Sequence, residues 1–166
     1  SDMGRIGNSR GASSVAFDLG VLYKCEINDW EGAGWSVGLH VSNLGPKINY
    51  LTSKDALPAT VKVGGAADLP FLQMHKLTLT ADLGYRLSPA DVQALSVSAG
   101  AEYAWRELVM LRGGYHCGDK KKGDASYATA GAGVEYAGVR LDFAWLFAGH
   151  EYLARNTFWV SLGYSF

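Results

Sequence analysis

The chain lacks any long hydrophobic run, since no window of its 166 residues approaches the roughly 18 consecutive apolar residues that a transmembrane helix needs. This absence excludes a helical span only, because the strands of membrane barrels carry a much weaker signal. An excess of charge is also missing: the formal net charge is -1, and no basic cluster is larger than 120–122. Nothing therefore points to nucleic acid as a partner. Residues 1–4 show no signal-peptide pattern, so a signal peptide is predicted to be absent, removed or encoded upstream.

Proline and cysteine are scarce, with 4 and 2 residues respectively. All four prolines fall in predicted connections, as expected for strands that are hydrogen-bonded on both sides. They are Pro46, Pro58, Pro70 and Pro89. Glycine, at 21 residues, and tyrosine, at 9, are by contrast abundant. This composition favours strands whose backbones approach closely and whose aromatic side chains lie at a membrane interface.

Large apolar side chains alternate with small or polar ones along most of the chain, and a period of two is the signature of a β-strand. The pattern is clearest in the closing stretch 156–166, where Trp159 is the one large residue on the polar face. The apolar face of this stretch, which we predict to direct membrane assembly, consists of Phe158, Val160, Leu162, Tyr164 and Phe166. An apolar face that continues to the last residue favours a barrel strand in lipid.

Nine strands of about ten residues are predicted, a length that crosses a bilayer at a tilt of roughly 45°. Residues 1–13 are polar and rich in glycine and serine, and we predict that they form an external loop or leader. A single barrel domain is predicted over 14–166. Its strands are predicted at 14–24, 35–42, 59–67, 77–86, 95–103, 109–116, 128–136, 139–147 and 156–166.

The second face of these strands carries ionised residues near the strand centres. They are Asp18, Lys62, Asp82, Glu102, Arg112, Glu135, Arg140 and Asp142. A soluble barrel or sandwich also alternates, but its narrow interior could not hold the many Trp, Phe, Leu and Tyr side chains of the apolar face. We therefore predict an all-β, antiparallel transmembrane barrel in a bacterial outer membrane, with lipid as a partner. Because the charges are balanced and spread over many strands, a salt-bridged lumen lining is favoured over a catalytic or transport site.

Patterns that indicate catalysis or metal binding are missing. His40, His116 and His150 have no acid or nucleophile at a spacing that supports catalysis, and no Ser/His/Asp constellation stands out. No Cys/His pair has the spacing of metal ligands. We therefore predict a protein that is not an enzyme and that uses neither a metal nor a cofactor.

Loop lengths predict the orientation, because outer-membrane barrels have short periplasmic turns and longer external loops. If the chain ends at the periplasmic side, the short connections 105–106 and 137–138 are periplasmic, although 69–75 is long for that side. The external loops are then 43–58, 118–124 and 148–155. A complete barrel has an even number of strands, so nine indicate either an odd number of strands upstream or one miscounted strand. We favour strands upstream.

The same orientation places Cys25 and Cys117 at opposite ends of their strands, roughly 25 Å apart across the apolar band. A disulfide requires Cα atoms within about 7 Å of each other. Both thiols are therefore predicted to be unpaired.

Two segments resemble the PorV/PorQ group of outer-membrane proteins, within the wider FadL-like barrels. The stretch 18–23 matches the D-x-G-x-x-Y pattern of one strand in that group. The stretch 42–50 matches S-N-x-G-x-K-I-x-Y and is followed by L-P-x-x-x-x-x-G at 57–64, which is the more specific signal. Later fragments such as 111–115 and 161–166 also fit the group, although Gly-Tyr pairs recur in many barrels.

The resemblance implies a FadL-like barrel of about fourteen strands, of which this chain holds the C-terminal portion. It also implies a non-enzymatic role in type IX secretion, with cargo and secretion-machinery proteins as partners. The loop 43–58 would then be a partner-contact surface through Lys47, Tyr50, Lys54 and Asp55, rather than a merely solvated loop. The alternatives are FadL-like uptake of hydrophobic small molecules and a structural barrel without transport.

Overall fold

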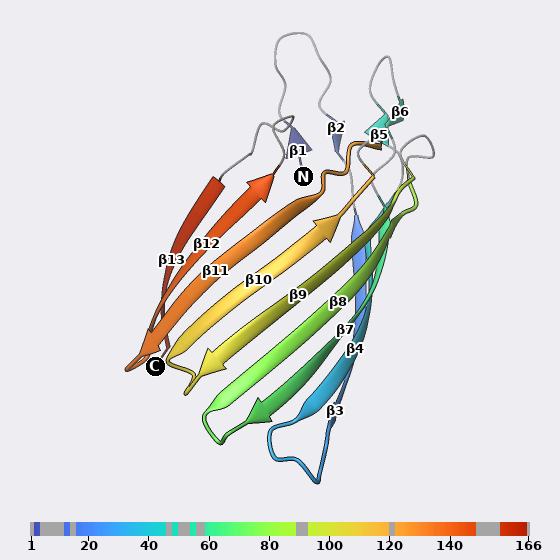
Figure 1. The fold of residues 1–166 in the computed structure, drawn as a ribbon. Helices are drawn as coiled ribbons and strands as arrows, with labels where there is room; N and C mark the ends of the chain where they lie inside the picture. The colour runs from blue at the N-terminus through green and yellow to red at the C-terminus, as the bar shows by residue number, and fades with distance from the viewer. Residues whose placement is uncertain are drawn as a thin grey trace.

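The computed structural model describes residues 2–3, 12–13, 16–45, 48–49, 54–55, 59–88, 93–119, 122–148 and 157–165. Nine strands in this part of the chain form one antiparallel sheet, in which each strand pairs with the next one along the chain (Figure 1). They are β3 (Phe17–Glu26), β4 (Gly34–Leu44), β7 (Thr60–Phe71), β8 (His75–Arg86), β9 (Leu95–Trp105), β10 (Val109–Cys117), β11 (Tyr127–Tyr136), β12 (Val139–Ala148) and β13 (Thr157–Tyr164). The predicted nine-stranded, all-β fold is confirmed.

Two small sheets of two strands each occur in segments that were predicted to be loops. β1 (Asp2–Met3) pairs with β2 (Ala12–Ser13), and β5 (Ile48–Asn49) pairs with β6 (Lys54–Asp55). Both small sheets lie beyond one end of the large sheet, whereas the short turns lie at its other end (Figure 1). The described residues contain no helix that is long and apolar enough to cross a membrane.

The large sheet is a single curved wall of tilted strands, with β3 and β13 as its edges (Figure 1). Within the described residues, each edge strand pairs with one neighbour only. β13 contains no Asp, Glu, Lys or Arg between Thr157 and Tyr164. Exposed sheet edges normally carry such charges, which prevent pairing with further strands. The composition of β13 therefore suits an edge that pairs with another strand.

The sheet has no hydrophobic core of the kind that a soluble domain builds. Among the described residues, the buried apolar side chains are only Ala33, Ala94, Ala104 and Met110. Large apolar side chains are exposed instead, and Leu162 reaches 75%. Apolar surface in water costs about 25 cal/mol per Å². A face of this kind therefore requires an apolar environment.

Aromatic side chains lie near both ends of the strands on the apolar face. At the end that carries the short turns, Tyr23 packs against Trp35 with ring centroids 5.6 Å apart. At the other end, Trp145 stacks on Phe147 at 5.6 Å. Smaller apolar residues occupy the same face between these two levels, for example the cross-strand neighbours Ala81 and Ala99. Two aromatic belts that flank an apolar band are typical of membrane barrels.

Two of the short turns differ from the connections that the sequence indicated. Trp105 pairs with Val109, so the turn comprises 106–108 and not the predicted 105–106. The connection predicted over 69–75 shrinks to Leu72–Met74, so it is no longer too long for the end that was predicted to be periplasmic. Several residues in these turns have positive φ without being glycine, including 51° and 58° in the pair 106–107. Such turns match the right-handed twist of hairpin strands.

Pro70 contradicts the prediction that every proline lies in a connection. It lies inside β7, in register with Lys76 of β8. The pairing of β7 with β4 ends at Asp68, so β7 has a neighbour on one side only where the proline occurs, and a missing N–H is tolerated there. The Pro70 carbonyl accepts a hydrogen bond from Trp30 Nε1 at 2.9 Å. The other three prolines lie outside the described residues.

Candidate functional site

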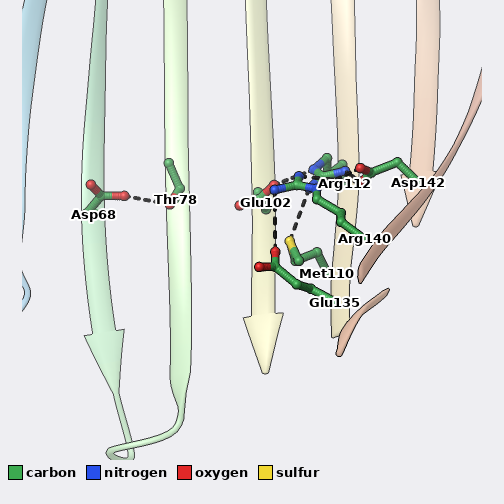
Figure 2. A network of polar contacts seen from close by, with 8 residues as sticks. All are labelled: Asp68, Thr78, Glu102, Met110, Arg112, Glu135, Arg140 and Asp142. Carbon is green, nitrogen blue, oxygen red and sulfur yellow. Dashed lines mark hydrogen bonds and ion pairs between the residues drawn. The ribbon is translucent and has the colours of Figure 1, made fainter. Parts of the chain in front are cut away.

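A network of ion pairs crosses four strands on the polar face of the sheet, with Arg112 of β10 at its centre (Figure 2). Arg112 Nε donates to Glu102 of β9, and Arg112 Nη1 donates to Asp142 Oδ1 of β12 at 2.6 Å. The guanidinium passes over β11 because Gly131 and Gly133 have no side chain there. A Cβ added at Gly133 would lie 3.4 Å from Arg112 Nη1 and 2.5 Å from Asp142 Oδ1.

Arg140 makes a second contact with the Asp142 carboxylate and extends the network to Glu135 of β11. Its Nε donates to Asp142 Oδ2 at 2.7 Å, and its Nη1 lies 3.7 Å from Glu135 Oε2. Below the guanidinium of Arg112, the buried Met110 places its sulfur 3.2 Å from Nη2 (Figure 2). Every charge in the network therefore has an opposite charge as its neighbour, which is typical of a lining that holds strands together.

A second, smaller polar cluster joins β7 to β8, where Asp68 and Thr78 are in register with Glu102 and Arg112. Thr78 Oγ1 donates to Asp68 Oδ1 at 2.6 Å (Figure 2). Lys76 Nζ lies 3.2 Å from the same oxygen. Both charged side chains are more exposed than Arg112 and its two partners, Glu102 and Asp142. Lone exposed pairs of this kind contribute little stability.

A hollow of about 550 Å³ lies on the polar face where β3, β4, β7 and β8 meet. Its floor is made of small residues such as Gly38 and Gly64, which are direct cross-strand partners. His40, Lys62 and Asp82 line it. Both residues are paired through their backbones in the sheet, but within the described ranges no hydrogen bond or ion pair involves the side chain of Lys62 or of Asp82. The predicted charged lining therefore divides into a paired group around Arg112 and an unpaired group in this hollow.

Asp18, which was predicted to belong to the lumen lining, has a separate partner. The backbone N–H of Asn43 donates to Asp18 Oδ1 at 2.7 Å. This bond joins the start of β3 to the end of β4, where the regular register between the two strands is interrupted.

A Ser/His/Asp chain, which the sequence did not reveal, lies at the opposite end of the polar face from the short turns. Ser98 Oγ lies 2.9 Å from His116 Nδ1, and His116 Nε2 lies 3.2 Å from Asp124 Oδ1. The sequence spacing of His116 indicated no acid or nucleophile as a partner, but the fold brings a serine and an aspartate to its ring. Its ring also stacks on Tyr127 at 4.9 Å. Ser98 lies mid-strand between two paired neighbours, so its backbone N–H is not free to serve as an oxyanion donor.

The family model for the type IX secretion system protein PorV matches residues 3–93, which is more than half of the 166 residues. The chain belongs to the PorV family. It is accordingly a component of the type IX secretion system, whose PorV proteins are outer-membrane components. A search of curated proteins finds no match. The segment matched to PorV contains Asp18, Asn43 and all the lining of the hollow, whereas the ion-pair network around Arg112 lies beyond it.

Several other residues predicted from the sequence lie outside the described residues; they are Lys47, Tyr50, His150 and Phe166. β6 consists of Lys54 and Asp55, whose side chains are not described. Phe158, Val160, Leu162 and Tyr164 are exposed on the apolar face of β13, and Trp159 is exposed on its polar face. Cys25 and Cys117 are both free. Cys25 is the last but one residue of β3, and Cys117 is the last of β10, which runs in the opposite direction, so the prediction that they lie at opposite ends of their strands is confirmed.

Proposed function

We propose that this PorV-family chain is part of a bacterial outer-membrane β-barrel that acts, without enzymatic activity, in protein secretion across the membrane or attachment at its surface. The observation that carries the proposal is the combination of an uncovered apolar face with membership of the PorV family. Lipid would cover the apolar face, and the polar face would line the lumen.

The proposed barrel is of the FadL type, with about fourteen strands and residues 14–166 as one domain. The position of β3 and β13 at the two edges of the described sheet supports this proposal, because a wall of this curvature needs further strands between them to close. The ends with short turns would face the periplasm. Segment 1–13 and the loop 43–58 would then face the outside, together with the Ser98–His116–Asp124 chain.

The partners would be cargo or other secretion-machinery proteins. The external loop 43–58, with Lys47, Tyr50, Lys54 and Asp55, is proposed as a contact surface because it carries the hairpin β5–β6 beyond the rim of the sheet (Figure 1). No chemistry is proposed at Ser98. A fluorophosphonate probe should therefore leave the protein unlabelled, and labelling that disappears in Ser98→Ala would overturn the non-enzymatic assignment.

The test of the secretion function compares a type IX secreting bacterium with and without the intact gene. Loss of the gene should leave cargo proteins inside the cell envelope, and affinity purification of the tagged protein in detergent should recover secretion proteins. The proposal fails if surface cargo is unchanged and no secretion protein co-purifies. Such a result would favour a structural barrel without transport.

A second candidate function, uptake of hydrophobic small molecules, is favoured by the hollow alone. Its glycine floor leaves room for a ligand, and Lys62 could hold an anionic group. Uptake of a fluorescent fatty acid should then depend on the gene and weaken in Lys62→Met. Uptake that is unchanged in both strains would eliminate this candidate.

A further inference from the structure

An aromatic cluster occupies the apolar face of the sheet at the end that carries the short turns. Phe71 of β7 and His75 of β8 are partners in register, and their rings stack with centroids 5.5 Å apart. His75 Nδ1 lies 2.6 Å from the hydroxyl oxygen of Tyr103 of β9. This hydroxyl can donate to Nδ1, which leaves Nε2 as an N–H donor with no acceptor among the described residues. The cluster therefore presents a polar hydrogen on an otherwise apolar surface.

A guanidinium group lies beside this cluster. Arg106 follows Trp105, which is the cross-strand partner of His75, and it has a φ of 51° in the turn between β9 and β10. The backbone N–H of Arg106 donates to the Met74 carbonyl at 2.7 Å, and its side-chain Nε donates to the Met74 sulfur at 2.9 Å. The guanidinium carbon lies 5.8 Å from the centre of the Trp105 ring. Contacts from two neighbouring turns thus hold the guanidinium at the apolar face.

The charge of Arg106 is not neutralised by another residue that the structure describes. Within those ranges, no ion pair joins it to the adjacent Glu107 or to any other carboxylate. The Met74 sulfur is a weak acceptor and occupies Nε only, so both terminal NH2 groups remain available. A planar guanidinium binds phosphate through two parallel hydrogen bonds. Tryptophan side chains of membrane barrels lie at the level of the lipid headgroups. The available donors therefore lie where a phospholipid places its phosphate.

The site does not depend on strands beyond the described sheet. Its residues belong to β7, β8 and β9 and to the turns at their ends, away from the edge strands β3 and β13 (Figure 1). Any strands that close the barrel would pair with those edges. The surroundings of Arg106 on the apolar face are therefore already complete in this part of the chain.

We infer that Arg106, together with Trp105 and His75, binds the headgroup of an anionic phospholipid. The guanidinium binds the phosphate, His75 Nε2 donates to a second headgroup oxygen, and the exposed rings of Trp105 and Phe71 pack against the upper acyl chains. An anionic lipid is favoured over a zwitterionic one, because the ammonium group of the latter already compensates its phosphate. The inference rests on the proposed membrane barrel, but not on its role in secretion.

The test titrates the full-length protein in a neutral detergent with phosphatidylglycerol or with phosphatidylcholine of the same acyl chains. Native mass spectrometry measures the dissociation constant of the first bound lipid. The unmodified protein should bind phosphatidylglycerol about tenfold more tightly, as expected from one charge-assisted contact that is open to solvent. Arg106→Gln should abolish this preference. Arg106→Lys, which keeps the charge but not the paired donors, should retain part of it.

Lys76→Gln is the matched control, because it removes a positive charge at the same end of the sheet but from the polar face. It should leave the preference for phosphatidylglycerol unchanged. His75→Phe keeps the stacking on Phe71 but removes the N–H, and it should weaken phosphatidylglycerol binding about threefold. Vesicles of phosphatidylcholine alone offer no anionic headgroup, so protein stability measured in them should not depend on this site. The heat-modifiable mobility of each variant on gels confirms that its barrel has assembled.

Equal affinities for the two lipids in the assembled, unmodified protein would overturn the headgroup site, as would equal losses in Arg106→Gln and Lys76→Gln. An excess of inorganic phosphate should not displace the lipid, because phosphate lacks the acyl chains that pack on the rings. Complete displacement would indicate an ion site and would also overturn the inference. If the unmodified protein assembles in neither detergent nor lipid, the proposed membrane barrel itself fails, whereas an assembled barrel without lipid preference contradicts the headgroup site alone.

Discussion

Replacement of Arg112 by methionine tests whether the ion-pair network holds the barrel wall together. The substitution keeps most of the alkyl volume next to Met110 but removes the hydrogen bonds to Glu102 and Asp142. Charge-assisted bonds contribute about 1.5–3 kcal/mol each when they are well protected. The Arg112 side chain is 30% exposed, so solvent screening reduces this value. We expect a loss of about 2–3 kcal/mol in the free energy of unfolding, since Asp142 keeps Arg140 but Glu102 loses its partner.

The matched control is Lys76→Met, which breaks a single pair with Asp68 whose lysine is 44% exposed. It should cost less than about 1 kcal/mol. Urea titration of the protein in phospholipid vesicles, followed by tryptophan fluorescence, measures both losses as shifts in the unfolding midpoint. Adding Glu102→Gln to Arg112→Met should restore part of the stability, because it removes the orphaned charge. Equal losses for the Arg112 and Lys76 variants, or no recovery in the double variant, would refute the reasoning.

Three further predictions concern the turns, the glycines and the orientation. Replacing Arg106–Glu107 by Asn-Gly should raise the free energy of unfolding in the same urea assay by about 1 kcal/mol, because that pair prefers positive φ at both positions; no change would argue against strain there. Gly133→Ala should cost about 1–2 kcal/mol through the clash with Asp142, and a double-mutant cycle with Asp142→Ala should show strong coupling rather than additivity. A membrane-impermeant maleimide should label Cys117 but not Cys25 on intact cells; preferential labelling of Cys25 would reverse the proposed orientation.

The strands were predictable because each depends on its own sequence. Alternation alone located the central strands, including β9 and β10, to within about two residues at either end. The prediction failed where the pairing of a strand changes along its length. Pro70 was placed outside the strand because a strand paired on both sides does not tolerate proline. β7 is no longer paired with β4 at Pro70, so the proline is tolerated there.

The polar contacts were less predictable because they depend on register. Ser98 faces His116 only if Trp105 pairs with Val109, and a turn placed at 105–106 shifts every partner along the two strands. Asp124 then reaches His116 from a loop whose path the sequence does not specify. The contact between Asp18 and Asn43 likewise requires a register shift that no pattern in the sequence indicates.

The charge-free edge strand β13 has a consequence for the time before the protein reaches its membrane. A strand that pairs with one neighbour only among the described residues, and that has an apolar face and no repelling charge, is a template for intermolecular β-pairing. Until that edge is paired and the apolar face is covered, the chain is expected to aggregate in water. If the proposed outer-membrane location holds, the chain would need a holding chaperone that masks β13 on its way there. Overproduction without one should yield insoluble protein that folds from urea only when detergent or lipid is supplied.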